Sequence, residues 1–290
     1  MNEKKNSLKK PHWLKISLGG GENFADIKGR LAQYKLVTVC EEALCPNRGE
    51  CWSARSLTVM LMGDVCSRSC AFCNVVAGKP RPLNKNEPKA VAEMIASLEL
   101  RHIVLTCVTR DDLDDGGALH WAETIGWIRK FAPETSIEAL VSDFGGSEPA
   151  QDIVIAAKPD VFAHNIETVK SLQPIARCKA NYETSLKLLN RAKNAGLLTK
   201  SGLMVGLGET DHEVRAALDD LAKTGVTIVT IGQYLQPSKE HLPVSRYVPP
   251  EMFEEYKRWG KESGIRLVIS APLVRSSYLA HAYLALNGDM

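Results

Sequence analysis

The stretch that decides the fold is LTVMLMGDVCSRSCAFC, residues 57–73. It begins with an apolar run at 57–63 and continues into three cysteines with the spacing C-x3-C-x2-C, which are Cys66, Cys70 and Cys73. An apolar run of this kind predicts a strand buried on both faces, as in a parallel sheet. In parallel α/β barrels, the loops that follow the carboxyl ends of strands carry the functional residues. The stretch therefore predicts a barrel strand followed directly by a metal-binding cysteine loop.

Apolar runs recur downstream and alternate with helical patterns. The predicted strands after the first are residues 102–108, 136–142, 160–166, 200–206 and 226–235, with 265–270 a candidate for one more. Apolar residues at i, i+3, i+4 and i+7 mark a helical face at 91–98 and another at 214–221. Thr210 and Glu213, at the start of the second helix, have the spacing of a capping box. Alternating strands and helices predict right-handed βαβ units, and hence an α/β protein with a parallel sheet or barrel.

Composition and charge narrow the classes of protein to which the chain can belong. Its 290 residues are 44% hydrophobic and 24% charged, which is ordinary for a globular protein, and the formal net charge is +2. This balance gives no reason to expect nucleic-acid binding, and no apolar run approaches the roughly 18 residues of a membrane helix. The N-terminal MNEKKNSLKKPHW has neither the apolar segment of a secretory signal nor the arginines of a transit peptide. We therefore expect a cytoplasmic protein, whose thiols stay reduced.

A second group of three cysteines lies upstream, in CEEALCPNRGEC at residues 40–51. Cys40, Cys45 and Cys51 have the spacing C-x4-C-x5-C, and the polar residues between them predict a loop. A [4Fe–4S] cube is usually held by thiolates, so each triplet would leave one of its four irons without a cysteine. Disulfides are disfavoured in a reducing compartment, and structural zinc sites favour four ligands, commonly as C-x2-C pairs. The two triplets therefore favour two iron–sulfur clusters over these alternatives.

The second triplet carries a family resemblance. C-x3-C-x2-C with an aromatic residue, Phe72, before the last cysteine resembles the signature of radical S-adenosylmethionine (SAM) enzymes. With the first triplet upstream and PLVRSSY at 272–278, the chain resembles the lipoyl synthases within that superfamily. The resemblance implies a partial parallel (β/α)6 TIM-like barrel of the radical SAM type at 57–271. It also implies an N-terminal extension at 1–56 with the auxiliary cluster motif, and a C-terminal extension at 272–290 with the RSSY motif.

The resemblance implies ligands and chemistry as well. In radical SAM enzymes the amino and carboxylate groups of SAM bind the open iron, and an electron passed through the cluster cleaves SAM to a 5′-deoxyadenosyl radical. The implied ligands are Cys66, Cys70 and Cys73 for the catalytic cluster, and Cys40, Cys45, Cys51 and Ser276 for an auxiliary cluster. The implied activity is that of a sulfurtransferase of lipoate biosynthesis and protein lipoylation. Such an enzyme inserts two sulfur atoms at C6 and C8 of a protein-bound octanoyl-lysine and takes them from the sacrificial auxiliary [4Fe–4S] cluster.

Polar residues at the ends of the predicted strands resemble SAM contacts of the superfamily. Asn165 and Glu167, in HNIET, would hold the ribose hydroxyls, although acidic residues are also favoured at a helix N-terminus. Gly206, in GLMVGLGET, resembles the strand that contacts adenine, and the alternative is a tight strand-to-helix turn. Arg177 and Arg275 are candidate partners of a carboxylate, and the alternative is a solvated arginine.

Other positions keep open interpretations. The loop TRDDLDDGGA at 109–118 would either admit the amino end of SAM or be a solvated acidic loop. His241 is a candidate active-site residue, Cys107 is predicted to be a small buried residue in its strand, and Cys178 is unassigned. Asn74 follows the last cysteine of the second triplet, where an aspartate is expected in many relatives. The SLGGGENF stretch in the N-terminal extension is predicted to be flexible.

The resemblance also implies partners. These are octanoylated lipoyl carrier domains (dehydrogenase E2 subunits and the glycine cleavage H protein), a ferredoxin or flavodoxin electron donor and an iron–sulfur cluster carrier, with no nucleic acid and no membrane. The basic KKNSLKK at 4–10 would either help an acidic carrier to dock or be a solvated tail. Two rival functions stay open: a radical SAM enzyme whose auxiliary cluster transfers electrons, and a non-catalytic iron–sulfur or zinc-binding scaffold.

Overall fold

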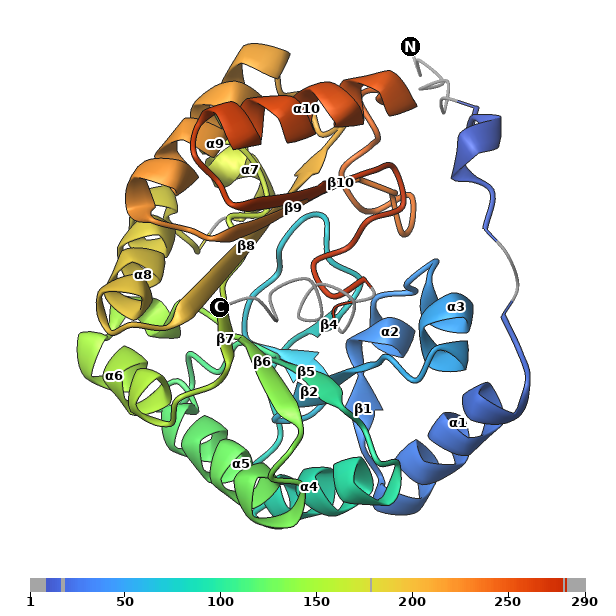
Figure 1. Ribbon diagram of the computed structural model, residues 1–290, viewed down its shortest axis with the longest axis vertical. Coiled ribbons are helices and arrows are strands. Elements are labelled where there is room, and N and C mark those ends of the chain that lie inside the picture. Colours follow the sequence, from blue (N-terminus) through green and yellow to red (C-terminus); the bar gives the residue numbers. More distant parts are fainter. Residues whose placement is uncertain (1–8, 17–18, 178, 279, 281–290) are drawn as a thin grey trace.

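A curved sheet of mostly parallel strands lies at the centre of the computed structural model, which describes residues 9–16, 19–177, 179–278 and 280 (Figure 1). In these residues the sheet has eight strands in the order β1-β2-β5-β6-β7-β8-β9-β10. The strands are β1 Val37–Thr38, β2 Thr58–Leu61, β5 His102–Cys107, β6 Ser136–Leu140, β7 Val161–Ala163, β8 Leu198–Val205, β9 Ile228–Gln233 and β10 Leu267–Ser270. Neighbouring strands from β2 to β10 are parallel, and β1 is antiparallel to β2. Because β1 and β10 are not paired with each other, the barrel is partial.

The predicted α/β class and partial TIM-like barrel are confirmed, and the parallel part of the sheet has one strand more than the (β/α)6 prediction. The additional strand is β10, within the candidate segment 265–270, and it pairs with β9 from Leu267 opposite Ile228 onward. All residues of β2 and β9 are buried, as expected for strands covered on both faces.

Helices cover the outer face of the sheet (Figure 1). The longer ones are α4 Glu87–Ser97, α5 Ala118–Phe131, α6 Glu148–Ala156, α8 Tyr182–Asn194, α9 Asp211–Thr224 and α10 Pro250–Glu262. Short helical segments are α7 Gln173–Ala176 and the single 3-10 turns His12–Leu14, Phe144–Gly146 and Lys170–Leu172. The predicted capping box of α9 is present, since the side chains and backbone amides of Thr210 and Glu213 bond reciprocally. No helix in the described part of the chain is long and apolar enough to cross a membrane.

The N-terminal extension joins the sheet through β1 and also forms helices α1 Glu22–Tyr34, α2 Val39–Glu42 and α3 Arg48–Ser53. The prediction of a loop around the first triplet is wrong in this respect, because Cys40 lies on α2 and Cys51 on α3. The polar residues that suggested a loop instead support a helix start: Thr38 caps α2 by accepting from the Glu41 amide, and acidic residues follow in the first turn.

The glycine run before α1 packs closely against α3, which differs from the predicted flexible segment. A Cβ on Gly19 would lie 2.1 Å from the carbonyl carbon of Gly49, and a Cβ on Gly49 would lie 2.3 Å from the Gly19 nitrogen. Ser53 adds a hydrogen bond to the Gly20 carbonyl at 2.9 Å. The absence of side chains therefore serves close backbone packing here.

The chain returns after β10 toward the N-terminal extension (Figure 1). Residues 271–278 form the C-terminal segment, which passes over the end of β9 and reaches the loop between α2 and α3. Gln233 N donates to the Pro272 carbonyl at 3.1 Å, and Asn47 Nδ2 donates to the Leu273 carbonyl at 2.6 Å. A Cβ on Gly232 would lie only 1.9 Å from the Val274 carbonyl oxygen, so a glycine at this position lets the segment approach the strand. Segments from both ends of the sequence thus meet beside β9.

Candidate active site

The second cysteine triplet lies in a loop that is tied to the carboxyl ends of several strands. Beyond β2, the short strands β3 Val65–Cys66 and β4 Val76–Ala77 pair in parallel and close the loop that holds Cys70 and Cys73. Ser67 N donates to Thr109 O at 3.0 Å, beyond β5. Ala71 N donates to Ala176 O at 3.0 Å, and Leu242 N donates to Ala71 O at 2.9 Å. The loop is therefore fixed from three sides before any ligand binds.

Arg68, between the first two cysteines of this triplet, is an internal anchor that the sequence reasoning missed. Its guanidinium donates to both carboxylate oxygens of Asp111 at 2.7 and 2.8 Å, and to Asp143, beyond β6, at 2.9 Å. Its hydrogen bonds hold the pKa of Asp111 below the usual range. For Asp143, burial raises the pKa, but the hydrogen bond and charge of Arg68, together with His164 and the Gly145 amide, lower it on balance. An arginine inside the motif was the only local signal, because its partners lie 43 and 75 residues away.

Three aspartates of the acidic loop at 109–118 make contacts within the protein while the loop stays largely exposed. Asp111 pairs with Arg68, Asp112 pairs with the buried Arg110 at 2.8 Å, and Asp115 accepts from the backbone amides of Gly117 and Leu119. The loop is therefore solvated, as one of the two interpretations has it, and it is also tied to its neighbours by these contacts. The loop is a structural brace beside the second triplet.

Two thiols of the second triplet, those of Cys70 and Cys73, lie in surroundings that disfavour the free thiolate. Burial raises the pKa of Cys70 to about 12, with Arg177 opposing the shift, and burial raises the pKa of Cys73 to about 11. Cys66 Sγ accepts from the backbone amides of Arg68 and Thr109 at 3.4 and 3.3 Å. Metal binding at Cys70 and Cys73 must therefore release protons at neutral pH.

Asn165 and Glu167, the pair predicted to contact SAM, lie beside this triplet together with Arg177, a separate candidate partner of a carboxylate. Asn165 Nδ2 donates to Glu167 Oε1 at 3.1 Å, and Arg177 donates to the Asn165 carbonyl at 3.1 Å. Burial raises the pKa of Glu167, with Arg177 and Asn165 opposing, and Glu167 and Arg177 both act electrostatically on Cys70. Asn165 Oδ1 is buried and has no hydrogen-bond partner among the described residues, so an acceptor is held ready for a donor that the protein itself does not supply.

Gly206 lies in the tight turn between β8 and α9, with a φ of 98° that favours glycine. Its amide donates to the buried Glu209 carboxylate at 2.6 Å, and its carbonyl accepts from Ser245 N at 2.8 Å. The structure thus shows the strand-to-helix turn that was the alternative interpretation. Glu209 is a second residue that the sequence reasoning missed, and it also accepts from the amides of Leu207 and Gly208.

His241 and Cys107 border the same loop. His241 Nε2 lies 2.9 Å from the Cys73 carbonyl oxygen and its Nδ1 lies 2.9 Å from Ser238 Oγ, so the imidazole braces the loop. Cys107 ends β5 close enough to Cys66 for an electrostatic interaction, and burial raises the pKa of its thiol to about 11. Cys178 lies outside the described residues.

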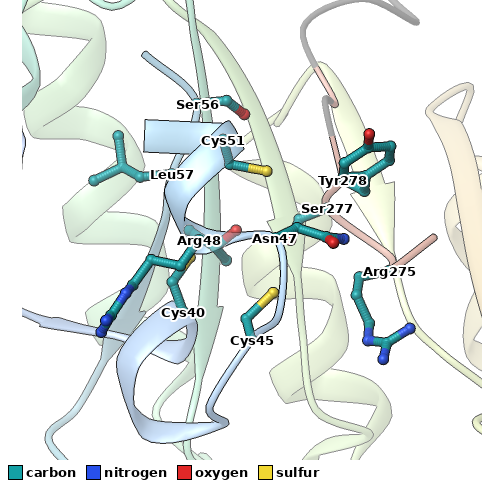
Figure 2. Close-up of a pocket in the computed structure, with 11 residues that line it drawn as sticks. Cys40, Cys45, Asn47, Arg48, Cys51, Ser56, Leu57, Arg275, Ser277 and Tyr278 are labelled. Carbon is teal, nitrogen blue, oxygen red and sulfur yellow. The ribbon is translucent and has the colours of Figure 1, made fainter. Parts of the chain in front are cut away.

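The first triplet lines one cavity together with the C-terminal segment (Figure 2). Figure 2 shows Cys45 and Cys51 directed toward that segment and the Arg48 guanidinium directed away from them. Burial raises the pKa of Cys40 to about 11, and Cys45 adds to the shift. The cavity lining consists of Cys40, Cys45, Asn47, Arg48, Cys51, Ser56, Leu57, Thr58, Arg275, Ser277 and Tyr278.

The C-terminal segment contributes polar groups to this cavity. Tyr278 Oη donates to Glu50 Oε1 at 3.0 Å, and burial, Glu50 and Cys51 together raise the pKa of this phenol to about 12. Arg275 is partly buried and interacts electrostatically with Cys45. Ser277 belongs to the cavity lining, and its neighbour Ser276 does not. The structure therefore brings the RSSY motif to the first triplet, with the second of its serines among the residues that line the cavity.

The donor set of the first triplet is compatible with an iron–sulfur cluster. In the described residues, no three side chains of histidine, cysteine, aspartate or glutamate converge on a point where they could hold one metal ion. A [4Fe–4S] cube does not require such convergence, because each thiolate binds a different iron. Three cysteines around one enclosed space are compatible with this geometry at the first triplet.

The fold and the cysteine loop define a radical SAM protein, and comparison with known proteins agrees. Residues 60–221 match the family model described as the radical SAM superfamily. The fold resembles methylornithine synthase (PylB), with a TM-score of 0.51 and 13% identity over 73% of this chain and 71% of that one. It also resembles HydG, a maturase of the [FeFe]-hydrogenase, with a TM-score of 0.53 and 12% identity over 86% of this chain and 68% of that one.

Closer relatives narrow the family. Residues 1–45 match the N-terminal domain of lipoyl synthase of the radical SAM family. The chain is 54% identical to the lipoyl synthase of Chlorobium chlorochromatii over 95% of this chain and 94% of the relative. It is 48% identical to the lipoyl synthase of Phocaeicola vulgatus over 98% of this chain and the full length of the relative. The chain belongs to the lipoyl synthase family.

Proposed function

We propose that the protein forms the lipoyl group by inserting sulfur at C6 and C8 of an octanoyl chain that is amide-linked to a lysine of a carrier protein. The observation that carries the proposal is the cavity in which the first cysteine triplet meets the C-terminal RSSY motif. Family membership at about half identity over nearly the whole chain supports the same reaction.

Each triplet has a separate role in this proposal. Cys66, Cys70 and Cys73 hold the catalytic [4Fe–4S] cluster, and Cys40, Cys45, Cys51 and Ser276 hold the auxiliary one. When bound, the first cluster with SAM supplies a hydrogen-abstracting radical, and the second supplies sulfur. The protein binds, orients and shields the reacting groups. Arg68 and His241 keep the catalytic loop in place through the contacts described above.

The proposed SAM contacts are based on Asn165 Oδ1, a buried oxygen beside the catalytic loop that has no hydrogen-bond partner among the described residues. The buried Asn165 Oδ1 and the Glu167 carboxylate offer acceptors to the ribose hydroxyls, and Arg177 balances the carboxylate charge. Gly206 has both backbone polar groups engaged, so it would offer SAM only an apolar surface next to the adenine. This role explains why a small residue is suited to the position without requiring a hydrogen bond from it.

The partners follow from the substrate. Octanoylated carrier domains, such as dehydrogenase E2 subunits and the glycine cleavage H protein, would deliver the octanoyl-lysine. A ferredoxin or flavodoxin would supply electrons, and an iron–sulfur carrier would rebuild the auxiliary cluster. We place the protein in the cytoplasm, where thiols remain reduced.

An anaerobic single-turnover reaction tests the function. The reconstituted protein receives SAM, a reductant and an octanoyl-lysine peptide, and the peptide mass, 5′-deoxyadenosine, iron and sulfide are followed together. We expect a singly and then a doubly thiolated peptide, with loss of sulfide from the protein. Deoxyadenosine without sulfur on the peptide would contradict sulfur insertion and favour an electron-transfer role for the second cluster.

The two adjacent serines provide a matched test of the fourth ligand. We expect Ser276→Ala to abolish sulfur transfer while SAM cleavage persists, and Ser277→Ala to retain both, although Ser277 is the residue that lines the cavity here. The iron content of each variant before turnover is the independent measurement. The reverse pattern would assign the ligand to Ser277.

A further inference from the structure

Asn74 connects the two cysteine loops directly. It follows Cys73, and its Nδ2 donates to the backbone carbonyl of Glu42 at 2.7 Å. Glu42 is the last residue of α2, the short helix that carries Cys40. The bond therefore joins the second triplet to the first across 32 residues of sequence.

The carbonyl that Asn74 contacts needs a donor from outside the helix. The final carbonyls of a helix have no amide one turn further on to bond them. Within α2, the carbonyls of Val39, Cys40 and Glu41 accept from the amides of Ala43, Cys45 and Leu44. These three hydrogen bonds engage the backbone amides of residues 43–45. The Asn74 amide group caps the next carbonyl in the series.

The rest of the catalytic loop is fixed on the other side. His241 Nε2 lies 2.9 Å from the Cys73 carbonyl oxygen, and Leu242 N donates to Ala71 O at 2.9 Å. The loop is thus bonded to the region beyond β9 on one side and to α2 on the other. Among these contacts, the Asn74 bond is the one that reaches the helix of the first triplet.

We propose that Asn74 is a positioning residue that fixes the loop of the second triplet relative to the helix of the first. The inference rests on the proposed function, in which hydrogen abstraction occurs at one site and sulfur comes from the other. The two insertions, at C6 and C8 of one chain, use the same pair of sites. In this chain, a direct bond between the loops helps to keep the two sites at one separation.

In this chain the contact requires an amide donor, so a relative with an aspartate at this position could not make the same bond. An aspartate at position 74 has nearly the same shape, but its carboxylate can only accept when ionised. It would place a negatively charged oxygen against the carbonyl oxygen of Glu42. Asn74→Asp therefore removes the bond with little change in volume, and Asn74→Ala removes it without adding charge.

The matched control is Asn84→Asp. Asn84 uses its side-chain oxygen, which accepts from Asn86 N at 3.0 Å, and an aspartate retains that acceptor. Both Asn→Asp variants therefore add one negative charge, and only the change at position 74 removes a hydrogen bond.

The first readout is amide hydrogen exchange of residues 43–45 in the anaerobically reconstituted protein. We expect exchange to be about tenfold faster in Asn74→Asp and Asn74→Ala than in the wild type and in Asn84→Asp, since about one hydrogen bond is lost. Unchanged exchange in both Asn74 variants overturns the proposal. So does a change confined to Asn74→Asp, because charge alone would then account for it.

The second readout separates positioning from simple stability. We expect the electron paramagnetic resonance spectrum of the doubly reduced protein to show altered coupling between the clusters in both Asn74 variants. We also expect a higher ratio of singly to doubly thiolated peptide. Faster exchange with an unchanged spectrum and ratio would make Asn74 merely structural and overturn the proposal. If the wild type forms no thiolated peptide, the proposed function fails, whereas the exchange and spectral comparisons still judge the contact between the loops.

Discussion

Gly232→Ala gives the sharpest test of how the C-terminal segment is docked. The added Cβ would lie 1.9 Å from the Val274 carbonyl oxygen, whereas ordinary van der Waals contact begins near 3.4 Å. The carbonyl must retreat by about 1.5 Å, because the strand that carries Gly232 is buried and cannot yield. The perturbation therefore acts on the segment rather than on the sheet.

Beyond Ala271, whose amide also bonds to Ile231 O, three hydrogen bonds among the described residues join the segment to the rest of the protein and would be lost or stretched. They are Gln233 N to Pro272 O at 3.1 Å, Asn47 Nδ2 to Leu273 O at 2.6 Å and Tyr278 Oη to Glu50 Oε1 at 3.0 Å. At about 1 kcal/mol each, docking weakens by about 3 kcal/mol, which corresponds to a roughly hundredfold change in the opening equilibrium. We expect the Gln233 amide to exchange with solvent up to about a hundredfold faster.

Native-state hydrogen exchange of the protein without added iron measures this directly. Gly126→Ala is the control, because a Cβ at Gly126 meets nothing within 4 Å and the residue lies within α5. We expect that control to leave Gln233 unchanged and to stabilise the helix by up to about 1 kcal/mol. Equal Gln233 protection in wild type and Gly232→Ala would refute the docking that the distances imply.

Two further predictions concern buried ionisable groups. Burial lowers the pKa of His164 to about 4 from 6.5, and Nδ1 donates to the Val141 carbonyl at 2.8 Å. Because the unfolded state then binds the extra proton, the free energy of unfolding should fall as the pH drops from 6.5 toward 4, by up to about 1.4 kcal/mol per pH unit. Urea unfolding at several pH values checks this, and an equally steep slope in His164→Gln would contradict it. The buried pair of Lys200 and Glu138, with Nζ 2.9 Å from both carboxylate oxygens, should cost about 3–5 kcal/mol when Lys200→Met removes one partner. Lys200→Met combined with Glu138→Leu should recover much of that loss in thermal unfolding, and a fully additive double variant would rule out the pairing.

Local patterns explain what could be predicted from the sequence. The apolar runs and the capping box of α9 depend on residues within a few positions of one another, so the strands, that helix and the α/β class follow from them. The partial barrel was implied instead by the resemblance to radical SAM enzymes, which rests on the cysteine spacings. Asn165 and Glu167 are two positions apart and were expected to act together, whereas their contact with Arg177 was not predicted. The polar residues of the first triplet were misleading, because acidic side chains at a helix start and in a loop look alike in sequence.

Long-range contacts explain what the sequence could not reveal. Arg68 meets Asp111 and Asp143 only because parallel strands bring their carboxyl ends together. The Asn74 bond to Glu42 and the packing of Val274 on Gly232 have no local signature. A serine repeat such as Ser276-Ser277 also hides which hydroxyl faces a cavity, since that depends on the backbone path of the whole C-terminal segment.

The first triplet and the C-terminal segment that packs beside it are synthesised at different times. Asn47 and Leu273 are separated by 226 residues, so the cysteines leave the ribosome long before their covering segment exists. At about 5–20 residues per second, that interval is roughly 10–45 s. For that time the three thiols are part of an incomplete pocket on a growing polypeptide. Assembly of the proposed auxiliary cluster with a ligand from the C-terminal segment must therefore wait until that segment has been synthesised.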